Sequence, residues 1–104
     1  VRVPDAEIEA AMRRVQEKFI RVENGDYFSL LELSPDATPQ AIDRAYEILR
    51  ARFQPSTLPY RCRTSMDREL RQIALALDEA RQILTDDALR EAYRAALIAT
   101  SPTA

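Results

Sequence analysis

Histidine is absent from this 104-residue chain, and glycine and cysteine each occur once. The lack of histidine excludes Ser-His and Cys-His catalytic pairs and removes the commonest metal ligand. One glycine is too few for a glycine-rich phosphate loop. The single Cys62 cannot form an internal disulfide, and without Cys or His neighbours we expect it to be a small loop residue, not a metal ligand or reactive thiol. These absences argue against an enzyme and predict no catalytic residue, no cofactor and no metal site.

Long apolar runs are also missing. No run approaches the ~20 residues that cross a bilayer, and the N-terminus mixes charged and apolar residues, unlike a signal peptide. Hydrophobic residues make up 46% and charged residues 31% of the chain, as in ordinary soluble proteins. We therefore expect one cytoplasmic domain with no membrane partner. Val1 stands where a complete chain would begin with Met, so we expect the module to be part of a larger protein.

The net charge of -2 conceals an arginine-rich stretch between residues 50 and 71. This stretch contains six arginines and two carboxylates, so +6 and -2 give it a net charge of +4. The rest of the chain therefore carries a net charge of -6. Such a patch predicts an oriented contact with an acidic protein surface, and a merely solvated surface is the alternative. The acidic total and the lack of a recognition helix with clustered Arg, Asn and Gln argue against nucleic acid. The predicted partner surface comprises Arg44, Arg50, Arg52, Arg61 and Arg63.

An amphipathic helix is predicted from about Pro4 or Asp5 to Glu23. Asn24 and Gly25 follow it, and both residue types tolerate the left-handed conformation that stops a helix. Its apolar residues fall on one stripe at spacings of three and four, namely Ile8, Met12, Val15, Phe19 and Val22. The stripe spans only about two heptads, so packing within the chain, and a monomer, are favoured over a coiled-coil dimer.

Start signals predict two further helices. Asp26 is an N-cap for a short helix. Thr38 is an N-cap followed by Pro39 at the first helical position, where the missing amide proton costs nothing. The helix that Thr38 begins ends before Pro55. Its predicted buried face consists of Ile42, Ala45, Tyr46, Leu49 and Phe53.

Two more helices complete the predicted set, and no segment has the pattern of a strand. Thr64 or Ser65 is expected to cap a long helix whose stripe should pack antiparallel on the preceding helix. The last helix is expected to begin near Asp86 or Asp87, carry Leu89, Tyr93 and Leu97, and end in a flexible tail over residues 100–104. The stripe of the long helix comprises Met66, Leu70, Ile73, Leu77, Ala80 and Leu84.

Short motifs recur in a defined order between residues 26 and 94. They are Asp26-Tyr27-Phe28, Ala45-Tyr46, a proline loop, Ala80-x-x-x-Leu84-x-Asp86 and Arg90-x-x-Tyr93. Together they resemble a DnaJ-type J domain. The resemblance implies an all-α, J-domain-like bundle with a central antiparallel helical hairpin, extending over residues 26–99. Residues 1–25 would form an additional N-terminal amphipathic helix.

The loop departs from the family pattern. Gln54, Pro55 and Ser56 stand where J domains carry His-Pro-Asp, the motif needed to stimulate the ATPase of a DnaK-type chaperone. The neutral hydroxyl of Ser56 cannot replace the charge-assisted bond of an aspartate. The second helix of the family presents a strongly basic face, whereas residues 40–53 carry a net charge of only +1 here. We therefore expect a J-like protein-protein interaction module that does not stimulate the chaperone.

Two core positions also differ. Ala74 stands where the family usually has Phe, and Arg81 replaces a Tyr. We expect Phe28, Tyr60 or the additional helix to fill that volume. The partner is unidentified, and two alternatives stay open: a co-chaperone that binds a DnaK-type chaperone through the non-standard loop, and a helical dimerisation module.

Overall fold

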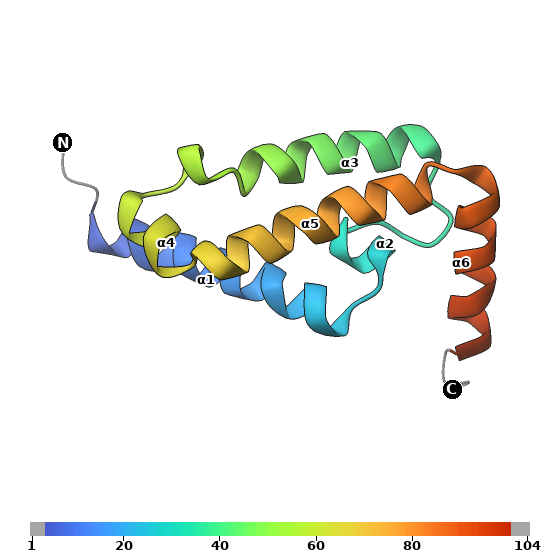
Figure 1. Ribbon diagram of the computed structural model, residues 1–104, viewed down its shortest axis with the longest axis horizontal. Helices are drawn as coiled ribbons and strands as arrows, with labels where there is room; N and C mark the ends of the chain where they lie inside the picture. The colour runs from blue at the N-terminus through green and yellow to red at the C-terminus, as the bar shows by residue number, and fades with distance from the viewer. Residues whose placement is uncertain (1–3, 101–104) are drawn as a thin grey trace.

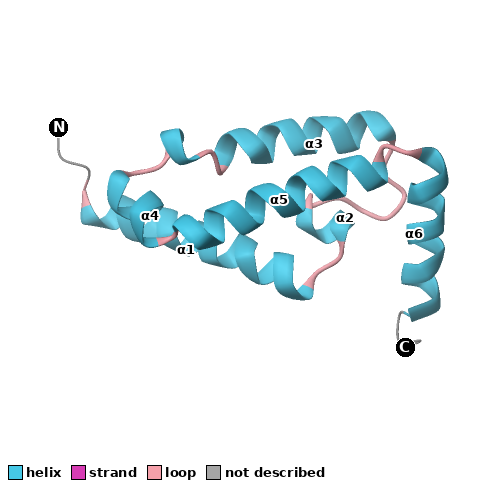
Figure 2. Cartoon of the chain, viewed as in Figure 1, coloured by secondary structure: helices cyan, strands magenta, loops and turns pink. Residues whose placement is uncertain are grey.

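The computed structural model describes residues 4–100, and the regular secondary structure of this part of the chain is entirely helical, with no strand. Figure 2 shows the helices connected by short loops. The all-α expectation is confirmed. Thr100, the first residue of the expected flexible tail, is instead the last residue of the final helix, and residues 101–104 lie outside the described residues. The elements are α1 (Asp5–Asn24), α2 (Tyr27–Leu30), α3 (Pro39–Arg52), the 3-10 helix η1 (Pro55–Thr57), α4 (Tyr60–Ser65), α5 (Asp67–Leu84) and α6 (Asp87–Thr100).

Helix α5 lies at the centre of the molecule. It packs against α1 on one side and α3 on the other, and α2 and α6 also contact it. Figure 1 shows that α3 runs antiparallel to α5, as expected, whereas α1 runs in the same direction as α5. Helix α6 lies across one end of this arrangement. Within the described part of the chain, no helix combines the length and apolar character needed to cross a membrane.

Side-chain caps explain where three of the helices begin. The side-chain oxygens of Asp26 and Thr38 each accept a hydrogen bond from the backbone N–H three residues on, at 2.8 and 3.2 Å. Asp86 does the same at the start of α6, at 3.0 Å. Each bond satisfies a backbone donor that has no partner inside the helix. The predicted N-caps Asp26 and Thr38 are therefore confirmed, and Asp86 caps the last helix where it was expected to begin.

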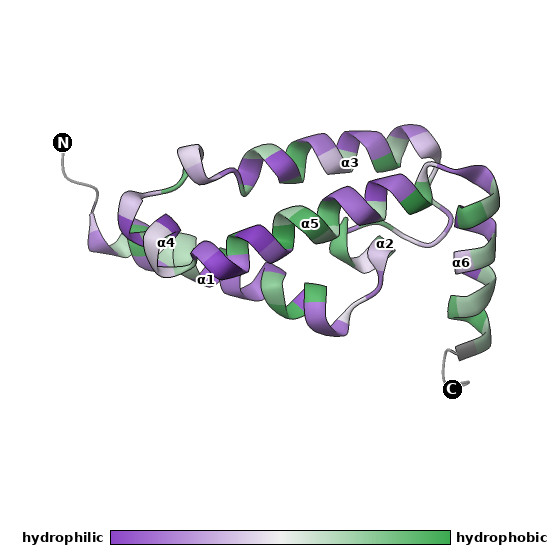
Figure 3. Ribbon diagram, in the orientation of Figure 1, coloured by the Kyte–Doolittle hydropathy of each residue, from purple (hydrophilic) through white to green (hydrophobic). Residues whose placement is uncertain are grey.

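The core forms where the apolar faces of α1, α3 and α5 meet. Figure 3 shows hydrophobic and hydrophilic residues alternating along α3 and α5, as expected for helices buried on one face. All six residues predicted for the stripe of α5 are buried. In α6, Tyr93 and Leu97 pack against the core, but Leu89 is largely exposed. From α1 the most deeply buried side chains are those of Ile8, Ala11, Val15 and Lys18.

Of the three groups expected to compensate for Ala74, two are packed in the domain: Phe28 is fully buried, and α1 packs along α5. Tyr60 is 68% exposed, so its predicted contribution to the core is wrong. Its ring instead lies beneath the guanidinium of Arg63, 5.3 Å from the ring centroid.

The connection between α3 and α5 is more ordered than expected. It contains η1 and α4, and Cys62 is fully buried in α4 instead of lying in a loop. Burial raises the pKa of its thiol. The predicted cap at Thr64 or Ser65 is wrong, because both residues belong to α4 and Thr64 donates a hydrogen bond to the carbonyl of Tyr60. Helix α5 begins after Met66, whose buried side chain has no capping oxygen.

Gly25 ends α1 for a different reason from the one expected. Its φ of -101° is extended backbone, and Asn24 still belongs to α1, so neither residue adopts the left-handed conformation. A Cβ atom at Gly25 would lie 2.8 Å from the carbonyl oxygen of Arg21. Glycine is therefore required here by space and not by its backbone dihedral angle.

Candidate functional site

The predicted loop is exposed at the end of α3. Phe53 is buried and anchors the loop to the core, whereas Gln54, Pro55 and Ser56 are all exposed. Pro55 begins η1, and the hydroxyl of Thr57 donates a hydrogen bond of 2.7 Å to the carbonyl of Gln54. The tripeptide is therefore held in a defined turn with its side chains available to a partner.

Part of the charge on α3 is already paired with α5. Arg50 forms an ion pair of 3.2 Å with Asp78, which also accepts a 2.6 Å hydrogen bond from the hydroxyl of Tyr46. Asp43 is paired with Arg81 at 3.0 Å. These contacts join the two helices along a partly exposed polar seam. A partner that approaches α3 would meet Arg50 with its charge partly neutralised.

The other arginines of the predicted partner surface lie in different surroundings. Arg44 and Arg52 are exposed on α3. On α4, Arg61 lies 3.7 Å from Asp5, with both side chains largely exposed, and Arg63 is partly buried against Tyr60. The predicted surface is thus divided between α3, which packs on α5, and α4, which packs on both α1 and α5.

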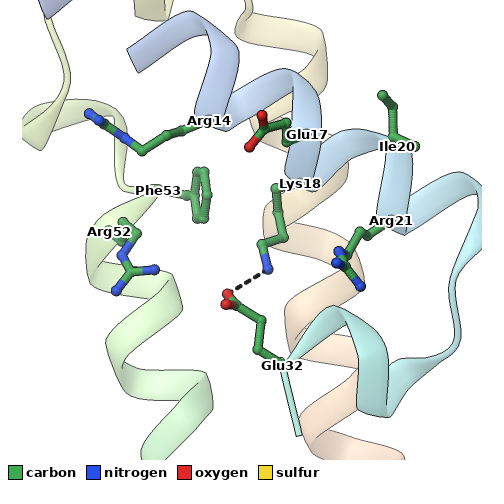
Figure 4. Close-up of a pocket in the computed structure, with 8 residues that line it drawn as sticks. All are labelled: Arg14, Glu17, Lys18, Ile20, Arg21, Glu32, Arg52 and Phe53. Carbon is green, nitrogen blue, oxygen red and sulfur yellow. Dashed lines mark hydrogen bonds and ion pairs between the residues drawn. The ribbon is translucent and has the colours of Figure 1, made fainter. Parts of the chain in front are cut away.

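A cleft of about 580 Å³ lies between α1, the segment after α2 and the end of α3. Figure 4 shows its residues, with Arg14 above and Arg52 below the Phe53 side chain in this view. Of the predicted partner arginines, Arg52 lines this cleft. The full lining comprises Arg14, Glu17, Lys18, Ile20, Arg21, Glu32, Arg52 and Phe53.

A buried lysine, Lys18, connects two of the segments that line the cleft. Lys18 is only 6% exposed and donates hydrogen bonds to the carbonyl of Leu30 at 3.0 Å and to the carboxylate of Glu32 at 2.9 Å. The hydrogen bond from Lys18 lowers the pKa of Glu32, and the charges of Lys18, Arg52 and Arg21 act in the same direction. Glu32 has a φ of 60°, a left-handed conformation that is uncommon outside glycine. The ion pair therefore accompanies a sharp turn after α2.

A second cleft of about 570 Å³ continues along α1 toward the loop. It lies between the first half of α1 and the segment from Ser56 to Pro59, and Arg14 lines both clefts. One residue of the predicted loop, Ser56, thus faces a groove that the additional helix forms. The two clefts together link the loop to the Lys18–Glu32 pair.

The sequence interpretation overlooked Arg14, Lys18, Arg21 and Glu32. A signal existed for Lys18, because it lies three residues after Val15 on the buried face of α1. A charged residue at such a position requires a buried partner. The identity of that partner depends on the turn at Glu32, which the sequence does not specify.

No protein-family model matches this chain, and no solved structure matches it. Nor does any group of three or more Cys, Asp or Glu side chains among residues 4–100 form a metal-binding cluster. The resemblance to a J domain therefore rests on the order of the sequence motifs, and the function that it implies stays a prediction.

Proposed function

We propose that this domain is a J-like protein-protein interaction module that does not stimulate the ATPase of a DnaK-type chaperone. The observation that carries the proposal is the loop after α3. Gln54, Pro55 and Ser56 form an exposed turn next to the antiparallel pair α3 and α5. The turn can contact another protein, but none of its side chains carries a charge that could pair with an arginine of the chaperone.

The charge distribution on α3 supports the same proposal. The net charge of residues 40–53 is only +1, and within this segment Arg50 and Asp43 are engaged with α5. A weak local field gives little electrostatic steering toward an acidic docking site. The loop, and helix α3, which would dock on the chaperone and bring the loop to the ATPase, thus both lack the charges that stimulation requires.

The two alternative functions, dimerisation and binding of a chaperone without activation, require different surfaces of the domain. A dimer through α1 would use a face whose central residues, Ile8, Ala11 and Val15, are buried inside the domain, so α1 would first have to detach. A co-chaperone that binds without activating would need only the exposed loop. Binding that depends on whether the chaperone holds ATP or ADP would favour this second role.

Single-turnover ATP hydrolysis by a DnaK-type chaperone tests the proposal. We expect no increase with the unmodified domain, whereas a J domain that carries His-Pro-Asp accelerates hydrolysis in the same assay. Substituting Gln54→His with Ser56→Asp should also have no effect, because the face of α3 remains weakly charged. Stimulation by the unmodified domain would contradict the proposal.

A second variant separates the loop from the helix. Gln40 and Glu47 are exposed on α3, so Gln40→Lys with Glu47→Arg adds +1 and +2 and raises the net charge of residues 40–53 from +1 to +4. These positions leave the pair of Asp43 and Arg81 intact. Combined with the restored loop, they should give measurable stimulation because the encounter becomes faster. On its own, the charged helix should have no effect.

A further inference from the structure

We infer that the cleft between α1 and the end of α3 binds an acidic segment of a partner protein, in which carboxylates alternate with apolar side chains. The inference rests on the proposed role as a protein-interaction module and adds the chemistry of the partner. The cleft is lined by cations, carboxylates and apolar side chains from α1, from the segment after α2 and from the end of α3 (Figure 4).

Positive charge is concentrated in the cleft. Four cations and two carboxylates line it, so +4 and -2 give +2. The whole chain carries -2, which leaves -4 for all other residues. A positive cleft on an otherwise acidic molecule attracts and orients an acidic partner. The lowered pKa of Glu32 is consistent with this local excess of positive charge.

Two of the four cations are available to a ligand. Lys18 already forms an ion pair with Glu32, and Arg21 donates a 2.7 Å hydrogen bond to the hydroxyl of Ser29. Within residues 4–100, neither Arg14 nor Arg52 forms an ion pair with a carboxylate. Both are exposed. A guanidinium binds a carboxylate through two parallel hydrogen bonds, so these arginines can bind acidic side chains without first breaking an ion pair in the domain.

Apolar residues line the cleft beside the charges. Phe53 and Ile20 both contribute, but Phe53 is only 6% exposed, so the half-exposed Ile20 supplies most of the apolar surface. An apolar side chain placed here would lose contact with water while its acidic neighbours reach the two guanidinium groups. The volume of about 580 Å³ is that of a pocket for a few side chains. These features select an acidic and apolar segment over a purely acidic one.

A nucleic acid fits the same cleft less well. Glu17 and Glu32 line it beside the arginines and would repel the closely spaced phosphates of a polynucleotide. A peptide can place its carboxylates opposite Arg14 and Arg52 and an uncharged residue opposite Glu17. The spacing of charge, and not its sign alone, favours a protein segment.

Fluorescence anisotropy with a labelled peptide tests the inference. The probe is a fluorescein-labelled peptide in which Glu and Leu alternate, and the control peptide has Gln in place of each Glu. We expect the acidic peptide to bind, the control peptide not to bind, and added NaCl to weaken binding because exposed charge contacts are screened. Arg14→Ala and Arg52→Ala should each weaken binding about tenfold, the loss expected for one charge-assisted hydrogen-bonded pair.

Matched charge reversals locate the site. Arg14→Glu with Arg52→Glu should abolish binding, whereas Arg13→Glu with Arg68→Glu should leave it within about twofold, the scatter of a typical surface change. Both double variants change the net charge by the same amount, from -2 to -6. All four positions are exposed, so circular dichroism should show unchanged helicity. Arg61→Glu with Arg63→Glu tests the arginines of α4, and it should also leave binding unchanged.

Several outcomes would overturn the inference. Equal weakening by both cleft and control reversals would assign binding to total charge, and a larger loss with the α4 reversal would place the site on α4. Tighter binding of a labelled single-stranded oligonucleotide than of the peptide would assign the cleft to nucleic acid. Absence of peptide binding together with no ATPase stimulation overturns this inference alone. Selective peptide binding together with stimulation by the unmodified domain overturns the proposed function alone.

Discussion

Lys18 of α1 donates hydrogen bonds to the carboxylate of Glu32 at 2.9 Å and to the carbonyl of Leu30 at 3.0 Å, so a single buried side chain attaches α1 to the end of α2 and to the segment that follows it. The lysine is 6% exposed, whereas the side chain of Glu32 is 54% exposed. The carboxylate thus neutralises a cation inside the protein while it remains in contact with solvent. Because both residues line the cleft, their pairing also fixes the position of one of its walls.

The pairing predicts a pH-dependent contribution to stability. Glu32→Gln should lower the free energy of unfolding at pH 7 by about 0.5–1 kcal/mol, a modest value because the carboxylate is screened by solvent. The folded-state pKa of Glu32 is lowered below its usual 4.5. Its contribution is therefore present above that value and is lost as the pH falls through the folded-state pKa.

Urea unfolding at pH 7 and at about pH 3 measures this contribution. The difference between wild type and Glu32→Gln should shrink at the lower pH. Glu23→Gln provides the control, since Glu23 is an exposed carboxylate on α1, and should change stability little at either pH. An equal difference between wild type and Glu32→Gln at both pH values would show that the charge of Glu32 does not act as described.

Two leucines on α5 provide a matched test of the core. Leu77 is fully buried and Leu75 is 63% exposed on the same helix. Leu77→Ala should lower the free energy of unfolding by about 2–5 kcal/mol, because it removes buried methyl groups and leaves a cavity. Leu75→Ala should change it by less than about 0.5 kcal/mol. Similar midpoints for the two variants in urea would mean that α5 is rotated relative to the core.

Deletion of residues 1–23 tests whether α1 belongs to the domain. Helix α1 packs along α5, so its removal should lower the melting temperature and uncover an apolar surface that binds a hydrophobic dye. Thermal melts and dye fluorescence measure the two effects. If the melt is unchanged but light scattering shows that a dimer has become a monomer, α1 is a dimerisation helix instead.

The long helices could be predicted because their signals are local. Spacings of three and four residues place Leu70, Leu77 and Leu84 on one face of α5, and side-chain oxygens at Asp26 and Thr38 determine where helices begin. Such patterns depend only on residues a few positions apart. They specify the faces that must be buried, and with them most of the core.

Other features depend on contacts between distant segments. Helix α4 is too short to show a helical period, and Cys62 is buried only because α4 packs against α1 and α5. Gly25 is explained by the position of one carbonyl oxygen, that of Arg21. The cleft forms where the chain turns at Glu32 and the side chain of Lys18 pairs with that residue. In the predicted arginine surface, Arg50 and Arg61 are paired with acidic residues on other helices. Tertiary geometry, which residue spacing does not encode, determines each of these.

The position of α1 next to α5 has a consequence for synthesis on the ribosome. Helix α1 is complete at Asn24, but the helix that covers its apolar face is complete only at Leu84. In contrast, α3 and α5 are near neighbours in the chain and can pair as soon as they emerge. During translation the part of the apolar face of α1 that packs on α5 therefore stays uncovered for most of the time that the domain is being made, and in this interval the nascent chain is most open to capture by other proteins or to aggregation.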